Sequence, residues 1–269
     1  MLETAQRILR FRGLLQTLVA RELKARYRGS FLGFFWSLVN PLLLLSVYTA
    51  VFGFIFRPPR AQLTDPYALF LVTGLFPWIW VSASLLEGTQ ALIANAGLIR
   101  KAVFPSEILP MIPVFANLVH FLFALPILAV ALIAGRLLGH PVGGWSAAVL
   151  PLVVLLELPL VGGIALGLAA LNVHFKDVRD LLANLLTLLF FLTPILYPLQ
   201  AVAKVRLLYP LVRWGNPFSP FTLAFQSALF SGRLPSLSLW LGMLIWSGLG
   251  WAAGSWLFAR LRDTLVEAV

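Results

Sequence analysis

Long apolar runs separated by short charged gaps dominate this sequence. Six predominantly apolar stretches each exceed the roughly 20 residues that a helix needs to cross a hydrocarbon core. The predicted spans are residues 31–56, 66–87, 108–135, 146–173, 181–203 and 234–259. The runs do not alternate apolar and polar residues as the strands of a membrane barrel would. The pattern therefore predicts an all-α integral membrane protein with six transmembrane helices in a domain over residues 31–259.

Composition and charge support this interpretation and add an orientation. The chain is 60% hydrophobic and 11% charged, whereas ordinary soluble domains are about 25% charged. Six spans place both termini on one side, and that side collects thirteen of the 20 Lys and Arg residues. Because cytoplasmic loops carry the excess of Lys and Arg, both termini and the tail over residues 260–269 are predicted to be cytoplasmic.

Residues 4–28 combine an apolar and a basic face at helical spacing. The apolar face holds Ile8, Phe11, Leu15, Leu18 and Val19. The opposing face holds Arg10, Thr17, Arg21, Lys24 and Arg28. Interfacial helices place such an apolar face against acyl chains and the basic face toward anionic headgroups. We therefore predict an amphipathic interface helix within residues 1–30, the alternative being that the arginines are only a topology signal.

Two connections are too long and too apolar for simple turns. Residues 95–105 predict a short cytoplasmic helix that ends before Pro105 and presents Arg100, Lys101 and Phe104 to a soluble partner; a membrane-surface stretch is an equal alternative. The external connection, residues 204–233, contains a turn-rich segment, Asn216–Pro220, before a short apolar helix. It predicts either a half-entering hairpin that closes a pathway or an interfacial loop.

Several residues inside the predicted spans suggest a structural or a functional role. Pro41 and Pro194 should kink or interrupt their helices. The glycine pairs 163/167 and 250/254 have the spacing that allows close helix approach. Glu157 lies within the fourth span, where an ionisable side chain is a functional hypothesis by default. Its alternatives are a position nearer the interface or a protonated carboxyl bonded between helices.

The sequence offers little enzymatic chemistry. It contains no GxxxxGK[ST] motif and no GxGxxG in a strand-to-helix context, so we predict no nucleotide site in this chain. The three histidines, His120, His140 and His174, are widely separated, and there is no cysteine, so no metal site is predicted. A membrane-embedded glycan enzyme would need convergent carboxylates or histidines. Some of the nine Trp and 21 Phe residues could instead line a sugar pathway.

Three segments carry a family likeness. They read LVARELKARYRGSFLGFFWSLVNPLL (residues 18–43), LIRKAVFPSEILP (98–110) and LNVHFKDVRDLLANLLTLLFFLTPILYP (171–198). In this order they resemble the type-2 ABC exporter permeases for polysaccharides, the O-antigen, capsule and teichoic acid group. The resemblance implies a bacterial inner-membrane permease that pairs with a second copy and with two separate ATPase subunits. These partners would bind ATP and Mg, and the complex would export a lipid-linked polysaccharide; no nucleic acid is implied.

The resemblance also implies roles for particular residues. The coupling helix that contacts the ATPase would contain Leu98, Ile99, Arg100, Lys101 and Phe104. The guide for a lipid diphosphate headgroup would contain Arg21, Lys24, Arg26 and Arg28. The external gate would contain Asn216, Pro217, Phe218, Phe221 and Phe225. The competing functions are a type-2 ABC exporter of drugs or other lipids, and a secondary transporter that uses Glu157 as a proton carrier.

Overall fold

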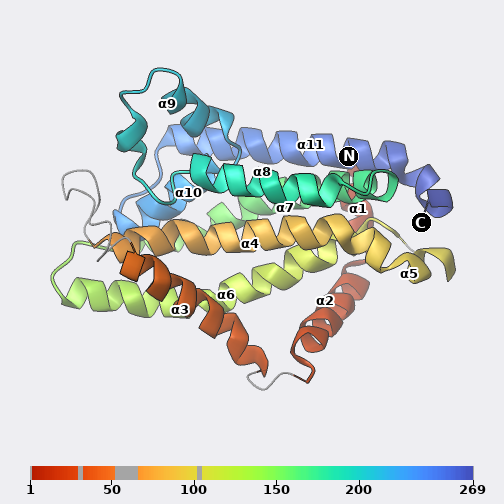
Figure 1. The fold of residues 1–269 in the computed structure, drawn as a ribbon, viewed down its shortest axis with the longest axis horizontal. Coiled ribbons are helices and arrows are strands. Elements are labelled where there is room, and N and C mark those ends of the chain that lie inside the picture. The colour runs from red at the N-terminus through yellow and green to blue at the C-terminus, as the bar shows by residue number, and fades with distance from the viewer. Residues whose placement is uncertain (1, 30–32, 52–65, 102–104, 269) are drawn as a thin grey trace.

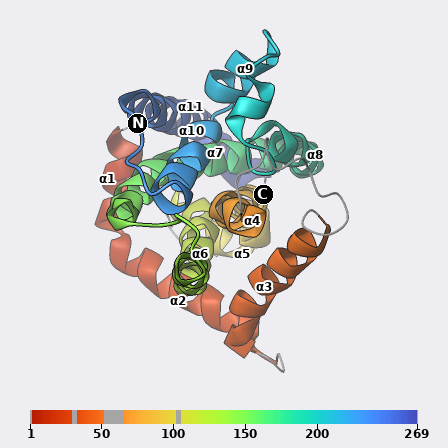
Figure 2. The same cartoon turned by 90° about the vertical axis from the view of Figure 1, so that its left-hand side faces the viewer.

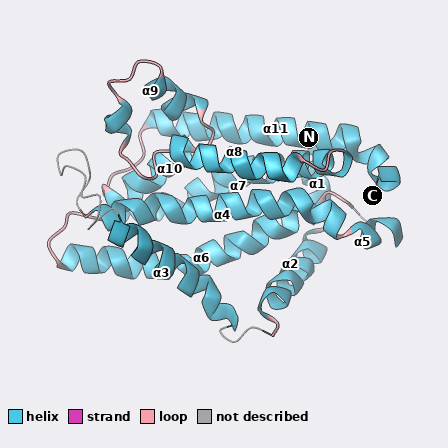
Figure 3. Cartoon of the chain, in the orientation of Figure 1, coloured by secondary structure: helices cyan, strands magenta, loops and turns pink. Residues whose placement is uncertain are grey.

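Helices connected by loops make up the whole of the described structure. The computed structural model covers residues 1–269 and describes all of them except 1, 30–32, 52–65, 102–104 and 269. No strand occurs among the described residues (Figure 3). The predicted all-α class is confirmed for this part of the chain.

The helical elements are numbered along the chain, and short 3₁₀ or π turns carry the letter η. They are α1 (Leu2–Arg10), α2 (Arg12–Tyr27), η1 (Gly33–Phe35), α3 (Trp36–Thr49), α4 (Tyr67–Ala94), α5 (Ala96–Lys101), α6 (Ile108–Leu137), η3 (Trp145–Val149), α7 (Leu150–His174), α8 (Val178–Leu192), η4 (Leu199–Val202), α9 (Leu208–Pro210), η5 (Leu211–Gly215), α10 (Ser219–Phe225), η6 (Gln226–Phe230) and α11 (Leu237–Ala268).

Among the described residues, four helical segments are long and apolar enough to cross a membrane. They cover Tyr67–Ala94, Ile108–Leu137, Trp145–His174 and Leu237–Arg262. The other two predicted spans differ from this picture. Within 31–56 the structure describes the 14-residue helix α3 but not residues 31, 32 or 52–56. Helix α8 has 15 residues and ends at Leu192, so the predicted span 181–203 is not one continuous helix.

The early end of α8 follows from Pro194. Thr193 adopts an extended backbone, with φ −82° and ψ 137°, as expected because a following proline disfavours helical geometry. The Thr193 backbone N–H and its hydroxyl both donate hydrogen bonds to the Leu189 carbonyl, at 2.7 and 2.6 Å. Pro41, by contrast, lies inside α3, which continues past it to Thr49.

Two other helices extend beyond their predicted ends because charged residues did not end them. Helix α4 continues past Glu87 to Ala94, and α11 continues past Arg260 to Ala268. The predicted N-terminal helix is divided at Phe11, whose φ of −98° and ψ of 22° separate α1 from α2. A helix that leaves the hydrocarbon core keeps its internal backbone hydrogen bonds, so a charge marks the membrane boundary and not the helix end.

Helices α4, α6, α7, α8 and α11 run along the long axis of the molecule (Figure 1). Both termini and α5 lie at one end, here called the terminal end. Helices α9 and α10 and the turn after α6 lie at the opposite end, here called the distal end. Helices α3 and α8 lie on the same side of the bundle (Figure 2).

The two predicted glycine pairs meet in the contact between α7 and α11. A Cβ atom on Gly254 would collide with the Gly163 carbonyl, and a Cβ on Gly163 would collide with the Gly250 carbonyl. A Cβ on Gly167 would lie 3.2 Å from the Gly254 Cα atom. Small residues allow helix backbones to approach in this way inside a membrane. The absence of side chains at these positions therefore sets the distance between α7 and α11.

This contact predicts a strong effect of a single methyl group. Gly254→Ala should lower the free energy of unfolding by about 1–3 kcal/mol because the Gly163 backbone must move away. The matched control is Gly248→Ala in the same helix, where no atom lies within 4 Å of the added Cβ. Thermal midpoints of the purified variants in detergent measure the difference. Equal midpoints would show that α7 and α11 can separate without cost.

Candidate functional site

A polar cluster at the terminal half of the bundle attaches α2 to α4 and α6. Arg26 of α2 forms an ion pair with Glu87 of α4 and donates a hydrogen bond of 2.9 Å to Asn117 Oδ1 of α6. Asn117 Nδ2 in turn donates to Glu87 Oε2 at 2.7 Å. Glu22 completes the cluster, with its Oε1 3.4 Å from Arg26 Nε. Each member has a charged or polar partner, so the cluster is a satisfied junction between three helices.

A second contact extends this junction. The Tyr27 hydroxyl lies 2.9 Å from His120 Nδ1, and the two rings stack with their centroids 5.6 Å apart. His120 therefore contacts the end of α2. In the part of the chain that the structure describes, no three His, Asp or Glu side chains gather in an arrangement that could hold a metal ion.

The apolar face of the N-terminal region packs on its own chain. Leu15 and Val19 are buried, and Ile8, Phe11 and Leu18 pack against the buried core. Arg21, Lys24 and Arg28 are exposed. The amphipathic pattern thus reflects contacts between α2 and the helical bundle, while most of its basic residues stay accessible at the surface.

Glu107 joins three segments at the terminal end. Its Oε1 lies 3.2 Å from Arg7 Nη1 of α1 and 3.3 Å from Arg262 Nη1 of α11. Glu107 itself is buried at the start of α6. A buried carboxylate requires such charged partners, since its transfer from water is costly. Both terminal helices are therefore tied to the residue that follows the connection containing α5.

Glu107 belongs to the segment LIRKAVFPSEILP, and the sequence alone gives it no role. The sequence does show a lone acidic residue directly before an apolar run, in a chain where basic residues are in excess. That signal predicts a buried ion pair at the membrane boundary, but it cannot say which arginines take part. Arg7 lies 100 residues away from Glu107 and Arg262 lies 155 residues away.

Helix α5 lies beside this junction, in the segment predicted to contact a soluble partner. Leu98 is 38% exposed, whereas Ile99 is 9% exposed and belongs to the buried core. The Asn95 side chain, just before α5, donates a hydrogen bond to the Ala91 carbonyl at 2.8 Å. The side chains of Arg100 and Lys101 and the whole of Phe104 lie outside the described residues. Of the described side chains in α5, Leu98 is available for a contact and Ile99 holds the helix in place.

A cavity of about 460 Å³ lies between α2, α4, α5 and α6. Arg21 and Arg26 line it together with Glu22 and Glu87, and Leu98 reaches it from α5. Two guanidinium groups and two carboxylates leave the lining close to neutral. The cavity by itself therefore has little electrostatic preference for an anion.

At the distal end the predicted gate residues lie inside the bundle. Phe218, Phe221 and Phe225 are buried, and so is Asn216. Asn216 Nδ2 donates a hydrogen bond to Thr193 Oγ1 at 2.8 Å, and its Oδ1 accepts one from the Phe218 backbone at 3.0 Å. Pro217 between them is partly buried. Residues 216–225 therefore pack inside the bundle.

The chain just after α8 forms hydrogen bonds with the predicted gate segment, residues 216–230. Gln226 is buried and its Nε2 donates to the Pro194 carbonyl at 2.7 Å, and Asn216 reaches Thr193 as described. Backbone freed from helical bonding at membrane depth must find partners inside the protein. Gln226 supplies such a partner to the Pro194 carbonyl, whereas Asn216 binds the side-chain hydroxyl of Thr193. The sequence did not identify Gln226 because the pairing is set by the fold.

Aromatic contacts hold the same segment from the other side. The Phe218 ring meets Trp78 of α4 edge to face, with centroids 5.7 Å apart. Phe225 meets Phe121 of α6 in the same manner at 5.9 Å, and Phe121 stacks on Trp80 at 5.6 Å. These are the preferred geometries of aromatic pairs. The predicted gate segment thus packs against α4 and α6 through aromatic rings. Hydrogen bonds join it to Thr193 and Pro194, which follow α8.

Glu157 belongs to neither end. It lies in α7, is 2% exposed, and its Oε2 atom has no hydrogen-bond partner among the described residues. The structure therefore separates Glu157 from the clusters at both ends of the bundle.

Comparison with known proteins adds a family to this geometry. Residues 13–231 match the model of the ABC-2 type transporter family. The O-antigen export system permease protein RfbA of Myxococcus xanthus is 36% identical over 271 residues, covering all of both chains. A protein of the same name from Klebsiella pneumoniae is 30% identical over 221 residues, 82% of each chain. The polysialic acid transport protein KpsM of Escherichia coli is 24% identical over 70% of this chain and 71% of its own. The chain belongs to the ABC-2 type transporter family.

Proposed function

We propose that this chain is the membrane permease subunit of an ATP-driven exporter for a lipid-linked polysaccharide of the O-antigen or capsule type. The observation that carries the proposal is the 36% identity with an O-antigen export permease over the full length of both chains. The similarity to a polysialic acid transport protein extends it to capsule-type glycans. The sequence motifs for phosphate binding are absent, so a separate ATPase must supply ATP hydrolysis and bind Mg.

The proposed complex contains two copies of this chain and two ATPase subunits in the bacterial inner membrane. The terminal end faces the cytoplasm in this proposal because most Lys and Arg residues lie in its connections. Helices α3 and α8 supply the first and fifth of six spans, each continued by neighbouring residues. Exposed apolar side chains on both helices, among them Leu43, Val47, Leu185 and Leu188, support a pathway between α3 and α8 of opposing subunits.

A reconstituted system tests the proposed function. Vesicles containing this permease and its ATPase should hydrolyse ATP faster when the lipid-linked glycan is added, and the glycan should become accessible on the opposite face. Stimulation by hydrophobic drugs but not by the glycan would favour a drug exporter. Glycan movement driven by a proton gradient without the ATPase, and abolished by Glu157→Gln, would contradict the proposal. The buried carboxyl of Glu157 is the group that such a proton-driven transporter would use.

The ATPase contact is proposed at α5. A short helix at the terminal end can transmit motion if one face is held by the permease and another is free for the partner. Ile99 is buried on the permease side and Leu98 is exposed, which supports this division. Glu107, which follows the same connection, ties it to α1 and α11 through Arg7 and Arg262. We therefore propose that force on α5 reaches both terminal helices.

Leu98→Asp should weaken binding of the ATPase at least about tenfold, because the interface would bury an unpaired charge in place of an apolar side chain. The matched control is Leu207→Asp, the same substitution at an exposed leucine of the distal end. Co-purification of the ATPase with each variant, quantified from detergent-solubilised membranes, measures the effect. Unchanged recovery with Leu98→Asp would place the docking surface elsewhere.

The headgroup guide is proposed on the exposed face of α2. Arg21, Lys24 and Arg28 are exposed and can attract a diphosphate. Arg26 differs from them because Glu22, Glu87 and Asn117 already surround its guanidinium group. We therefore propose a guiding role for the three exposed residues and a structural role for Arg26.

Replacement of Arg21, Lys24 and Arg28 together by Gln should lower glycan export by at least about fivefold, since one basic residue near an anionic surface contributes about 1 kcal/mol. ATPase binding and thermal stability should stay unchanged. Arg26→Gln should show the reverse pattern, with a lower thermal midpoint because Glu87 loses its partner. Export assays and melting curves on the same preparations separate the two roles. Normal export in the triple variant would remove the guide from the mechanism.

A further inference from the structure

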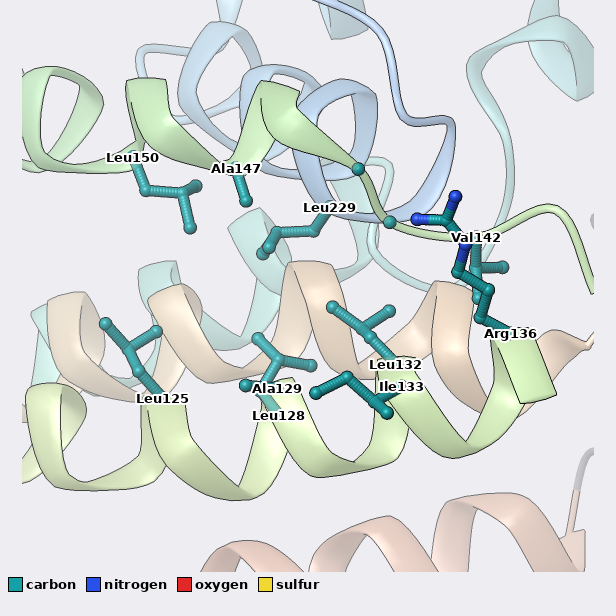
Figure 4. Close-up of a pocket in the computed structure, with 12 residues that line it drawn as sticks. Leu125, Leu128, Ala129, Leu132, Ile133, Arg136, Val142, Ala147, Leu150 and Leu229 are labelled. Atoms are coloured by element: carbon teal, nitrogen blue, oxygen red, sulfur yellow. The ribbon is translucent and has the colours of Figure 1, made fainter.

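An apolar groove at the distal end is not used by the proposed transport mechanism. Its volume is about 270 Å³, and it lies between the second half of α6 and the segment formed by η3 and the start of α7. Leu125 and Leu132 line it from α6, Ala147 and Leu150 from the opposite side, and Leu229 of η6 from its floor (Figure 4). Arg136 is the one charged residue among the described residues that line it, and it lies at one end.

The walls of this groove are held at fixed positions. Ser146 is buried and its hydroxyl donates a hydrogen bond of 2.7 Å to the Ala228 carbonyl, which ties η3 to η6. The chain returns from α6 through Gly143, whose φ of +70° favours glycine. A Cβ on Gly232 would lie only 2.7 Å from the Gly143 carbonyl oxygen. Hydrogen bonding and close backbone contact therefore fix the positions of η3 and η6 on either side of the groove.

The open side of the groove is suited to a bilayer. Val130 and Ile133 of α6 are exposed beside it, and α6 is one of the helices able to span a membrane. Arg136 is exposed in the last turn of that helix, where the chain leaves the apolar run. Its side chain has no hydrogen-bond or ion-pair partner among the described residues. An unpaired guanidinium group at the end of an apolar groove matches a molecule with an acyl chain and a phosphate.

We propose that the groove binds one membrane phospholipid, with an acyl chain along Leu125, Leu132 and Leu150 and its phosphate at Arg136. Acyl chains are as apolar as leucine, so apolar contact alone would not select a bound lipid over the surrounding ones. The selection comes from the charge-assisted hydrogen bonds that a guanidinium group donates to a phosphate. This inference goes beyond the proposed function, because the site lies apart from the guide on α2.

The position of Leu229 gives the bound lipid a consequence for the gate. Leu229 lies in η6, which directly continues the gate helix α10. The neighbouring Ala228 carbonyl accepts the hydrogen bond from Ser146. An acyl chain in the groove therefore contacts the same segment that Gln226 anchors at Pro194. The lipid would restrain the distal end of the gate segment.

Photolabelling tests this proposal on the full chain in vesicles. The probe is phosphatidylglycerol with a diazirine on one acyl chain, and labelled peptides are mapped by mass spectrometry. Adducts should concentrate on residues 125–133, 147–150 and 229. Arg136→Gln should lower them about fivefold, and Arg136→Lys should retain most of them. Ala129→Phe, which fills the groove but keeps the charge, should also lower them. Arg206→Gln, at another exposed basic residue of the distal end, is the matched control.

Three results would overturn the proposal. Equal labelling of the groove in Arg136→Gln, Ala129→Phe and the control would indicate ordinary lipid contact. Equal labelling by a diazirine diacylglycerol, which has no phosphate, would remove the role of Arg136. The chain contains no cysteine, so Ile133→Cys also tests for a second copy: efficient disulfide dimers through this residue would make the groove a subunit interface. Melting curves establish that each variant is folded. If Arg136→Gln does not fold, Arg136→Lys and Ala129→Phe still test the proposal.

Discussion

The close contact between the α7 and α11 backbones is the constraint on which the other parts depend. Gly163 and Gly254 allow the two helices to approach until the backbone of one touches the other. In a membrane, helix association relies on such close packing because lipid is as apolar as the side chains. This contact positions α11, and α11 in turn carries Arg262 to Glu107 at the terminal end. A change in the distance between α7 and α11 would therefore shift Arg262 relative to Glu107.

The two ends of the bundle are stabilised by different interactions. At the terminal end, charged groups are paired across helices that are distant in sequence, as Arg26 is with Glu87 and Arg7 is with Glu107. At the distal end, aromatic rings and amide side chains hold the gate segment. Any displacement of Phe218 or Phe225 would therefore have to move the rings packed against them.

Sequence patterns predicted the parts of this protein that depend on local composition. The apolar runs identified the all-α membrane class, and three motifs in order identified the transporter family, which the comparisons confirm. The glycine spacing identified surfaces that do come into contact. Helix ends were predicted less well, because charges were taken as boundaries. Glu87 lies inside α4, and its partners Arg26 and Asn117 come from other helices, so no local pattern predicts this arrangement.

The basic residues of α2 show most clearly what the sequence determined and what it left to the fold. The sequence by itself predicted that they share the basic face of an amphipathic helix, because hydrophobicity, helical period and positive charge are properties of neighbouring residues. It assigned Arg21, Lys24, Arg26 and Arg28 the same role. Only the tertiary structure separated Arg26 from the others, since its carboxylate partner on α4 lies 61 residues away. The same holds for Glu107 and Gln226, because which polar groups meet inside a bundle depends on how the helices pack.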